Sequence, residues 1–100
     1  MGDKRKYTRK RVEVQILANN SLHGTLLDIS LKGCRLAILS KPFTKGDNLN
    51  VILFYRNKLI ELELTICYVR GIQYGCKINT LSDFTSWVRL LETSPKLQAI

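Results

Sequence analysis

Hydrophobic and polar residues alternate with a period of two along most of this chain, as in β-strands that bury one face. The longest alternation places apolar residues at every second position from Ile60 to Tyr68, all of which we expect to face inward. Gly71 and Gly75 are expected to bracket the turn that follows it. Five other segments have the same character and are separated by turn-forming residues: 12–16, 24–30, 34–38, 48–55 and 74–78. The pattern therefore predicts six β-strands.

The period changes to that of a helix near the C-terminus. Asp83 can cap a helix at about 82–93 that ends before Pro95, and we expect Phe84 and Trp87 of that helix to pack in the core. Six short antiparallel strands followed by one helix predict an all-β domain over residues 12–95. The expected architecture is a closed or nearly closed antiparallel barrel plugged by the helix, because closure leaves no exposed strand edges.

Length and composition fit one small globular domain. The chain has 100 residues, of which 45% are hydrophobic and 24% charged, close to ordinary globular usage. Its apolar runs are shorter than the roughly 18 residues that a membrane span needs. Three cysteines without paired spacing, Cys34, Cys67 and Cys76, predict neither a zinc site nor a disulfide framework. We therefore expect reduced thiols and a cytoplasmic protein.

The positive charge is concentrated at the N-terminus. The formal net charge is +8, and six of the sixteen Lys and Arg residues lie within residues 1–11. A localised surplus of this kind favours an anionic partner, which the charge alone leaves open between a nucleotide, nucleic acid, an acidic lipid surface and an acidic protein. We treat residues 1–11 as a basic arm that is mobile until a ligand neutralises it.

Two short motifs have side chains suited to a guanine nucleotide. Arg5 and Arg9 are four residues apart in the basic arm, and a guanidinium fork matches both phosphate and the O6 and N7 acceptors of guanine. Asp28 is a hydrogen-bond acceptor for guanine N–H groups, and Ser30 lies on the same side of its strand. Gly33 can adopt positive φ and can admit close approach of a ligand to the backbone.

Each motif also has a purely structural interpretation. A basic terminus is usually a solvated tail, and Asp-x-Ser-x-x-Gly between two strands is usually a turn in which Asp and Ser bond to nearby backbone. His23 has no partners at metal-ligand spacing. The sequence contains no nucleophile–base pair or carboxylate dyad that we can identify, so we expect neither catalysis nor a bound metal.

The two motifs together, in this order within a six-strand pattern, resemble those of the PilZ domain family. The resemblance extends over nearly the whole chain and includes the turn at 45–47, the segment 74–78 and the closing helix. It implies a six-stranded β-barrel that typically binds the bacterial second messenger cyclic di-GMP without enzymatic activity. Processes regulated in this way include motility and biofilm formation.

The resemblance also implies roles for individual residues. Arg5 and Arg9 would grip phosphate and the Hoogsteen edge of guanine, whereas Asp28 and Ser30 would hold the other guanine and its phosphate, with Gly33 providing clearance. Two further candidates for ligand binding are Lys4, at a position where members often have arginine, and Arg35.

The implied function is that of a cyclic di-GMP receptor that acts through a downstream protein. Two alternatives stay open at this point. The first is a PilZ-like adaptor for a motility or secretion protein that binds no nucleotide. The second is a basic barrel for single-stranded nucleic acid, with Tyr7, Phe54 and Tyr55 as stacking groups.

Overall fold

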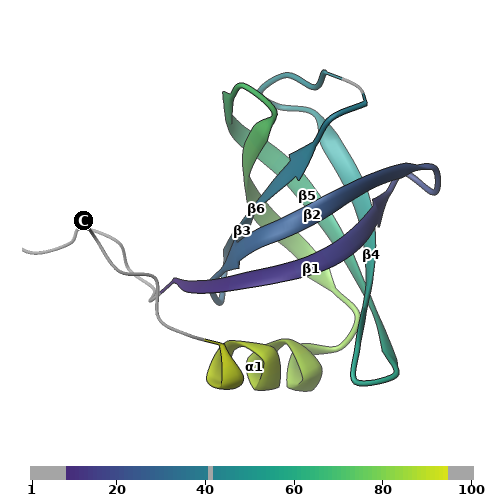
Figure 1. Ribbon diagram of the computed structural model, residues 1–100. Helices are drawn as coiled ribbons and strands as arrows, with labels where there is room; N and C mark the ends of the chain where they lie inside the picture. Colours follow the sequence, from purple (N-terminus) through teal and green to yellow (C-terminus); the bar gives the residue numbers. More distant parts are fainter. Residues whose placement is uncertain (1–8, 41, 95–100) are drawn as a thin grey trace, which may run out of the picture.

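The computed structural model describes residues 9–40 and 42–94, which form six strands and one helix (Figure 1). The elements are β1 (Lys10–Ala18), β2 (Leu22–Ile29), β3 (Gly33–Ile38), β4 (Asn48–Tyr55), β5 (Lys58–Arg70), β6 (Gln73–Leu81) and α1 (Phe84–Thr93). In this part of the chain no helix combines the length and the apolar character that crossing a bilayer requires.

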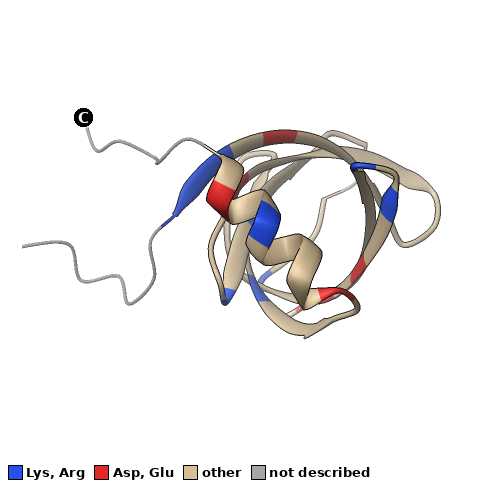
Figure 2. Cartoon of the chain, turned by 90° about the horizontal axis from the view of Figure 1, so that it is seen from below, with Lys and Arg blue, Asp and Glu red and all other residues tan. Residues whose placement is uncertain are grey.

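The strands form a closed antiparallel barrel in the order β1-β2-β3-β6-β5-β4. Its last seam is short, because β1 and β4 pair only through Ile16–Ala18 and Val51–Leu53. The helix α1 lies across the barrel end next to this seam, and Figure 2 views the molecule from that end. The six-stranded barrel with a C-terminal helix is the architecture expected from the alternation of the sequence.

The barrel interior is filled by the apolar residues of the alternating strands. On β5 the inward residues are Ile60, Leu62, Leu64 and Ile66, each at most 2% exposed. The helix contributes Trp87, which is fully buried, together with Leu90 and Leu91. Because α1 inserts these side chains into the open end of the barrel, helix and strands share one hydrophobic core.

Tight turns connect several of the strands. Arg56 and Asn57 both have positive φ, 51° and 64°, as in the two-residue hairpin turns that match strand twist. Gly71, with φ 62°, begins the turn between β5 and β6. Gly75, which we expected at a turn, is instead a buried residue within β6.

Three further positions differ from the sequence-based expectation. β1 begins at Lys10 rather than Val12, because Lys10 and Arg11 pair with Ile29 and Asp28; the basic arm therefore does not include these two residues. Phe84 is 59% exposed, since burial on α1 begins only at Ser86. Tyr68 is also exposed, for a reason that bears on the site below.

Candidate functional site

Asp28 is a fully buried carboxylate in the wall of an otherwise apolar barrel. It lies on β2 directly opposite Arg11 of β1 and Arg35 of β3. The register is irregular next to Asp28 in both of its strand pairings, between Leu26 and Asp28 in the β2–β3 pairing and between Arg11 and Val14 in the β1–β2 pairing. Bulges of this kind change where side chains point, and here they bring Asp28 into the same cross-strand row as Arg35.

Two guanidiniums neutralise this carboxylate. Arg9 Nη2 lies 3.0 Å from Asp28 Oδ1, and Arg35 Nη2 lies 2.8 Å from Oδ2. Beyond these ion pairs, the carboxylate oxygens have no hydrogen-bond partner of good geometry among the described residues, and the buried Arg35 Nε has none either. The arginine side chains are 20% and 29% exposed, whereas that of Asp28 is 0% exposed. The cluster thus holds two cations at the surface over one buried anion.

Ser30 and Gly33 close the tight turn between β2 and β3. The Ser30 amide donates to the Gly33 carbonyl at 2.8 Å, and the Gly33 amide donates to Ser30 Oγ at 3.1 Å. The Ser30 hydroxyl also donates a hydrogen bond to the Gly33 carbonyl oxygen, at 3.3 Å. Trp87 Nε1 donates to the Ser30 carbonyl at 2.9 Å, which ties the turn to α1.

A glycine is needed at position 33 because β6 approaches it closely, and not because its backbone has an unusual φ. Among the described glycines, only Gly46 and Gly71 have positive φ, so the left-handed conformation considered for Gly33 is not the one it adopts. A Cβ atom at Gly33 would lie 2.7 Å from the carbonyl oxygen of Cys76. The glycine therefore permits close pairing of β3 with β6 at this turn.

The structure brings together part of the predicted site. Arg9, Asp28 and Arg35 form one ion-pair cluster, and Ser30 and Gly33 form the adjacent turn. Arg5 and Lys4 lie outside the described residues. The predicted role of Arg35 was secondary, yet here it is an immediate partner of the buried carboxylate.

Tyr68 is a neighbour of the cluster that the sequence pattern placed in the core. The β5–β6 register shifts between Ile66 and Tyr68, so Tyr68 is opposite Gly75 on the outer face and is 41% exposed. Its ring lies over Gly75, where an added Cβ would collide with Cε2 of the ring. Gly75 is in turn opposite Arg35. Tyr68 is therefore an exposed aromatic residue two strands away from Arg35, with Gly75 of β6 between them.

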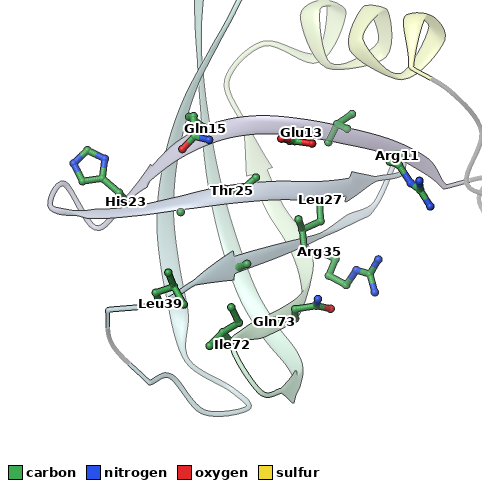
Figure 3. Close-up of a pocket in the computed structure, with 13 residues that line it drawn as sticks. Arg11, Glu13, Gln15, His23, Thr25, Leu27, Arg35, Leu39, Ile72 and Gln73 are labelled. Atoms are coloured by element: carbon green, nitrogen blue, oxygen red, sulfur yellow. The ribbon is translucent and has the colours of Figure 1, made fainter.

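A groove of about 700 Å³ begins at the cluster and crosses the outer face of β1, β2, β3 and the β5–β6 turn. Figure 3 shows Arg11 and Arg35 at one end of this groove and His23 and Leu39 at the other. Its floor includes the small residues Gly24 and Ala37. The arginine end is thus open to a ligand, although Asp28 itself does not line the groove.

Two buried thiols lie beneath the cluster. Cys34 and Cys76 are opposite each other on β3 and β6, and both are free. A hydrogen bond with Cys76 and burial raise the pKa of Cys34 well above its ordinary value, with a smaller contribution from the Asp28 charge. Within residues 9–40 and 42–94, no group of three or more His, Cys, Asp or Glu side chains is arranged to hold a metal ion.

Comparisons with known proteins agree with this architecture. The model of the family described as PilZ domain matches residues 3–92. The solved structure of the inhibitor of motility MotI/DgrA from Bacillus subtilis has the same fold, with a TM-score of 0.70 and 14% sequence identity. The alignment covers 92% of this chain and 53% of that one, so the chain spans about half the length of MotI/DgrA. A comparison with curated proteins returns no significant match.

Proposed function

The chain belongs to the PilZ domain family, and on that premise we propose that it is a non-enzymatic receptor for cyclic di-GMP. The observation that carries the proposal is the cluster in which buried Asp28 holds the guanidiniums of Arg9 and Arg35 at the surface. Stability alone does not explain this cluster, because replacing a buried ion pair by apolar packing is often neutral or stabilising. Two arginines over one carboxylate leave a net positive charge, which together with the basic residues that precede Arg9 would attract a dianionic ligand.

The geometry favours a positioning role for Asp28. The sequence alone predicts this carboxylate as a direct acceptor for guanine N–H groups, but its side chain is 0% exposed and each oxygen already has a guanidinium within 3.0 Å. A ligand that approaches from the groove meets the arginines first. We therefore propose that Asp28 orients Arg9 and Arg35, whose remaining N–H donors bind phosphate or the Hoogsteen edge of guanine.

The remaining residues of the motifs have assigned roles in this proposal. Arg5 and Lys4 supply further positive charge from the N-terminal arm. The Ser30 hydroxyl exchanges its long bond to the Gly33 carbonyl, 3.3 Å, for a ligand oxygen. Gly33 allows the turn to lie close to β6, because a side chain at this position would meet the carbonyl oxygen of Cys76.

Tyr68 completes the proposed site as a surface on which a base can stack. Its ring covers Gly75, and Gly75 is the residue opposite Arg35 on the neighbouring strand. Base–aromatic stacking contributes roughly 1–3 kcal/mol per base, and guanidinium groups stack on bases as well. Tyr68 and Arg35 together would then hold one guanine between a ring and a cation.

The proposed mechanism is the ordering of residues 1–8 by the ligand. Arg9 is held by Asp28 without ligand, so the chain enters the barrel beside the arginine end of the groove. A dinucleotide bound there would attract the basic residues that precede Arg9 and fold them across it, which changes the surface offered to a downstream protein. Because ordering consumes part of the binding energy, we expect micromolar affinity, about −8 kcal/mol.

Calorimetric titration with cyclic di-GMP tests the proposal, with GTP and a short single-stranded oligonucleotide as controls. We expect saturable binding of the cyclic dinucleotide alone, and the molar ratio at the inflection of the titration curve gives the stoichiometry. Arg9→Ala and Arg35→Ala should each weaken binding at least tenfold, about 1.4 kcal/mol. The matched control is Arg89→Ala, an exposed arginine of α1, which should leave the affinity unchanged. Absence of binding by the folded protein would overturn the proposal.

A thermodynamic cycle separates the two roles considered for Asp28. If Asp28 acts through the arginines, Asp28→Asn lowers affinity, and adding Arg35→Ala to that variant lowers it little further. If the carboxylate contacts guanine directly, the two losses add. Additive losses would restore the direct-acceptor assignment without affecting the receptor proposal.

One observation favours a second candidate function, a nucleotide-free adaptor. The ion pairs of Asp28 are complete without a ligand, so the cluster can also be a structural element. The similar fold of an inhibitor of motility suggests a protein partner as the target of such an adaptor. Lack of binding in the calorimetric titration would make this the preferred function.

The described residues give little support to single-stranded nucleic acid as the ligand. Phe54 is 70% exposed, but its neighbour Tyr55 is half-buried and its hydroxyl lies 2.9 Å from Thr93 Oγ1. Consecutive residues of a strand face opposite ways, so the two rings do not form a continuous stacking surface.

A further inference from the structure

The hairpin between β4 and β5 and the N-terminal half of α1 enclose a second, smaller pocket of about 190 Å³. It shares no residue with the Asp28 cluster or with the groove beside it. The residues that line it are Tyr55, Arg56, Lys58, Asp83, Thr85, Ser86 and Arg89. We call this the hairpin–helix pocket.

Positive charge dominates the hairpin–helix pocket. Arg56, Lys58 and Arg89 are all exposed, and no ion pair of theirs occurs among the described residues. Arg56 lies over the Tyr55 ring at 5.4 Å from its centroid, a contact that keeps the guanidinium beside the pocket. The pocket therefore presents three cations that form no ion pair within the described residues, although the charge of Lys58 helps to lower the pKa of Asp83.

The one carboxylate of the pocket has another role. Asp83 accepts hydrogen bonds from the Ser86 amide at 3.0 Å and from Ser86 Oγ at 2.7 Å, as the N-cap of α1. These bonds use both of its oxygens. Asp83 thus stabilises the helix. The cations remain available to bind an acidic group of another molecule.

The walls of the pocket are held in place by contacts between the hairpin and the helix. The Tyr55 hydroxyl lies 2.9 Å from Thr93 Oγ1, and Ser82 Oγ accepts a 2.8 Å hydrogen bond from the amide of Glu61. These contacts join β4 to the end of α1 and β5 to its beginning. The backbone segments that carry the cations are thereby fixed relative to each other, which lowers the entropic cost of binding an anionic group.

Phe84 adds an exposed apolar side chain at the start of the helix that forms one wall of the pocket. It precedes Thr85 of the pocket wall and is 59% exposed. A large exposed aromatic side chain beside unpaired cations is typical of protein-binding surfaces, where aromatic residues and arginine are enriched.

We infer that the hairpin–helix pocket is a docking surface for an acidic segment of a partner protein, with carboxylates on Arg56, Lys58 and Arg89 and an apolar side chain on Phe84. The argument is charge complementarity in a concave site. Separate cations around a small pocket fit discrete carboxylate side chains, whereas a lipid surface would need cations that project from a convex face. The inference does not depend on nucleotide binding.

The test uses a blocked pentapeptide of sequence EELEE as the probe, with QQLQQ as its uncharged control. Titration into isotopically labelled protein is followed by amide chemical shifts. We expect the acidic peptide to shift residues 55–58 and 83–89, more strongly at 20 mM than at 200 mM salt, and the control to shift neither segment. Low salt strengthens such contacts because screening is weaker.

Charge reversal at the pocket is compared with an equal change elsewhere. Arg56→Glu combined with Arg89→Glu should weaken peptide binding at least tenfold. Lys45→Glu combined with Lys77→Glu, at two other exposed positions, changes the net charge equally and should weaken binding less than twofold. If the reversed pair does not fold, Arg56→Gln combined with Arg89→Gln replaces it, with loss of binding again expected.

Three results would overturn the inference. The first is shifts confined to residues 9–11 and 35, which would place the peptide at the arginine cluster. The second is equal loss of affinity in both double variants, which would indicate net charge alone. The third is binding of phosphatidylglycerol vesicles that depends on Arg56 and Arg89 when the peptide does not bind, which would indicate a membrane surface. Because no nucleotide is present, each result is distinct from failure of the receptor proposal.

Discussion

The indole of Trp87 donates a 2.9 Å hydrogen bond to the carbonyl oxygen of Ser30, 57 residues earlier in the chain. Trp87 is fully buried in the core, and Ser30 closes the β2–β3 turn of the candidate site. The bond therefore connects the helix that plugs the barrel with the motif beside the arginine cluster.

Replacing Trp87 with phenylalanine should measure this connection. The variant leaves the buried Ser30 carbonyl without its donor and removes part of a large core side chain, so we expect a loss of about 2–4 kcal/mol in the free energy of unfolding. Urea denaturation followed by circular dichroism gives the value. Phe84→Leu, at an exposed position of the same helix, should change it by less than about 0.5 kcal/mol. Equal effects of the two variants would contradict the structural role of the bond.

Asp28→Asn should destabilise the ligand-free protein. Removing the carboxylate charge leaves the Arg9 and Arg35 guanidiniums without an anion, although their exposure of 20% and 29% lets water compensate in part. We expect a cost of about 1–3 kcal/mol. In a protein that already carries Arg9→Gln and Arg35→Gln, the same substitution should cost less, because its partners are absent. An unchanged cost in that background would show that the ion pairs do not contribute.

Alanine at Gly33 and at Gly75 should have different consequences. A Cβ at Gly33 meets the backbone carbonyl of Cys76 at 2.7 Å, whereas at Gly75 it meets the outer ring atoms of Tyr68. The backbone cannot move away but an exposed ring can, so Gly33→Ala should cost about 1–3 kcal/mol of stability and Gly75→Ala less. Gly75→Ala should instead weaken cyclic di-GMP binding by displacing Tyr68. Thermal denaturation and calorimetry distinguish the two effects; equal destabilisation would contradict the geometry.

The contribution of Asp83 to stability should depend on pH. Hydrogen bonds from Ser86, first from its amide and then from its hydroxyl, lower the pKa of Asp83. A carboxyl group whose pKa is lower in the folded protein stabilises it above the unfolded value of about 3.9 and loses this contribution as pH falls through the folded value. Asp83→Asn, which caps without titrating, should therefore be less sensitive to acid between pH 5 and pH 2. If the urea midpoint fell equally in the two proteins over this pH range, the result would contradict the assignment.

The three cysteines should differ sharply in reactivity. Cys67 is exposed on β5, whereas Cys34 and Cys76 are buried, and the pKa of Cys34 is raised by its hydrogen bond with Cys76 and by burial. Alkylation requires the thiolate, so iodoacetamide should modify Cys67 alone in the native protein. Cys34 and Cys76 should react only after denaturation. Peptide mapping by mass spectrometry gives the extent at each site. Rapid native modification of Cys34 would show that the barrel opens near the arginine cluster.

Local patterns in the sequence were sufficient to predict the secondary structure. The alternation from Ile60 to Ile66 and the helical spacing around Trp87 follow from which side chains a strand or a helix buries, and the structure confirms both. The pattern failed at Tyr68, because the extra residue in the β5–β6 pairing turns that side chain outward. A bulge depends on the partner strand, so alternation within β5 alone does not reveal it.

At the candidate site, too, the sequence predicts some features and contacts between strands decide the others. The sequence by itself determined which functional groups are available: the arginines, Asp28 and the turn from Ser30 to Gly33, in an order that resembles the PilZ family. Only the tertiary structure decided that Asp28 is buried and that Arg9 and Arg35, on either side of it in the barrel, neutralise its charge. The physical reason is that burial and ion pairing depend on contacts between strands, and the register of β1, β2 and β3 sets those contacts through interactions distant in the chain.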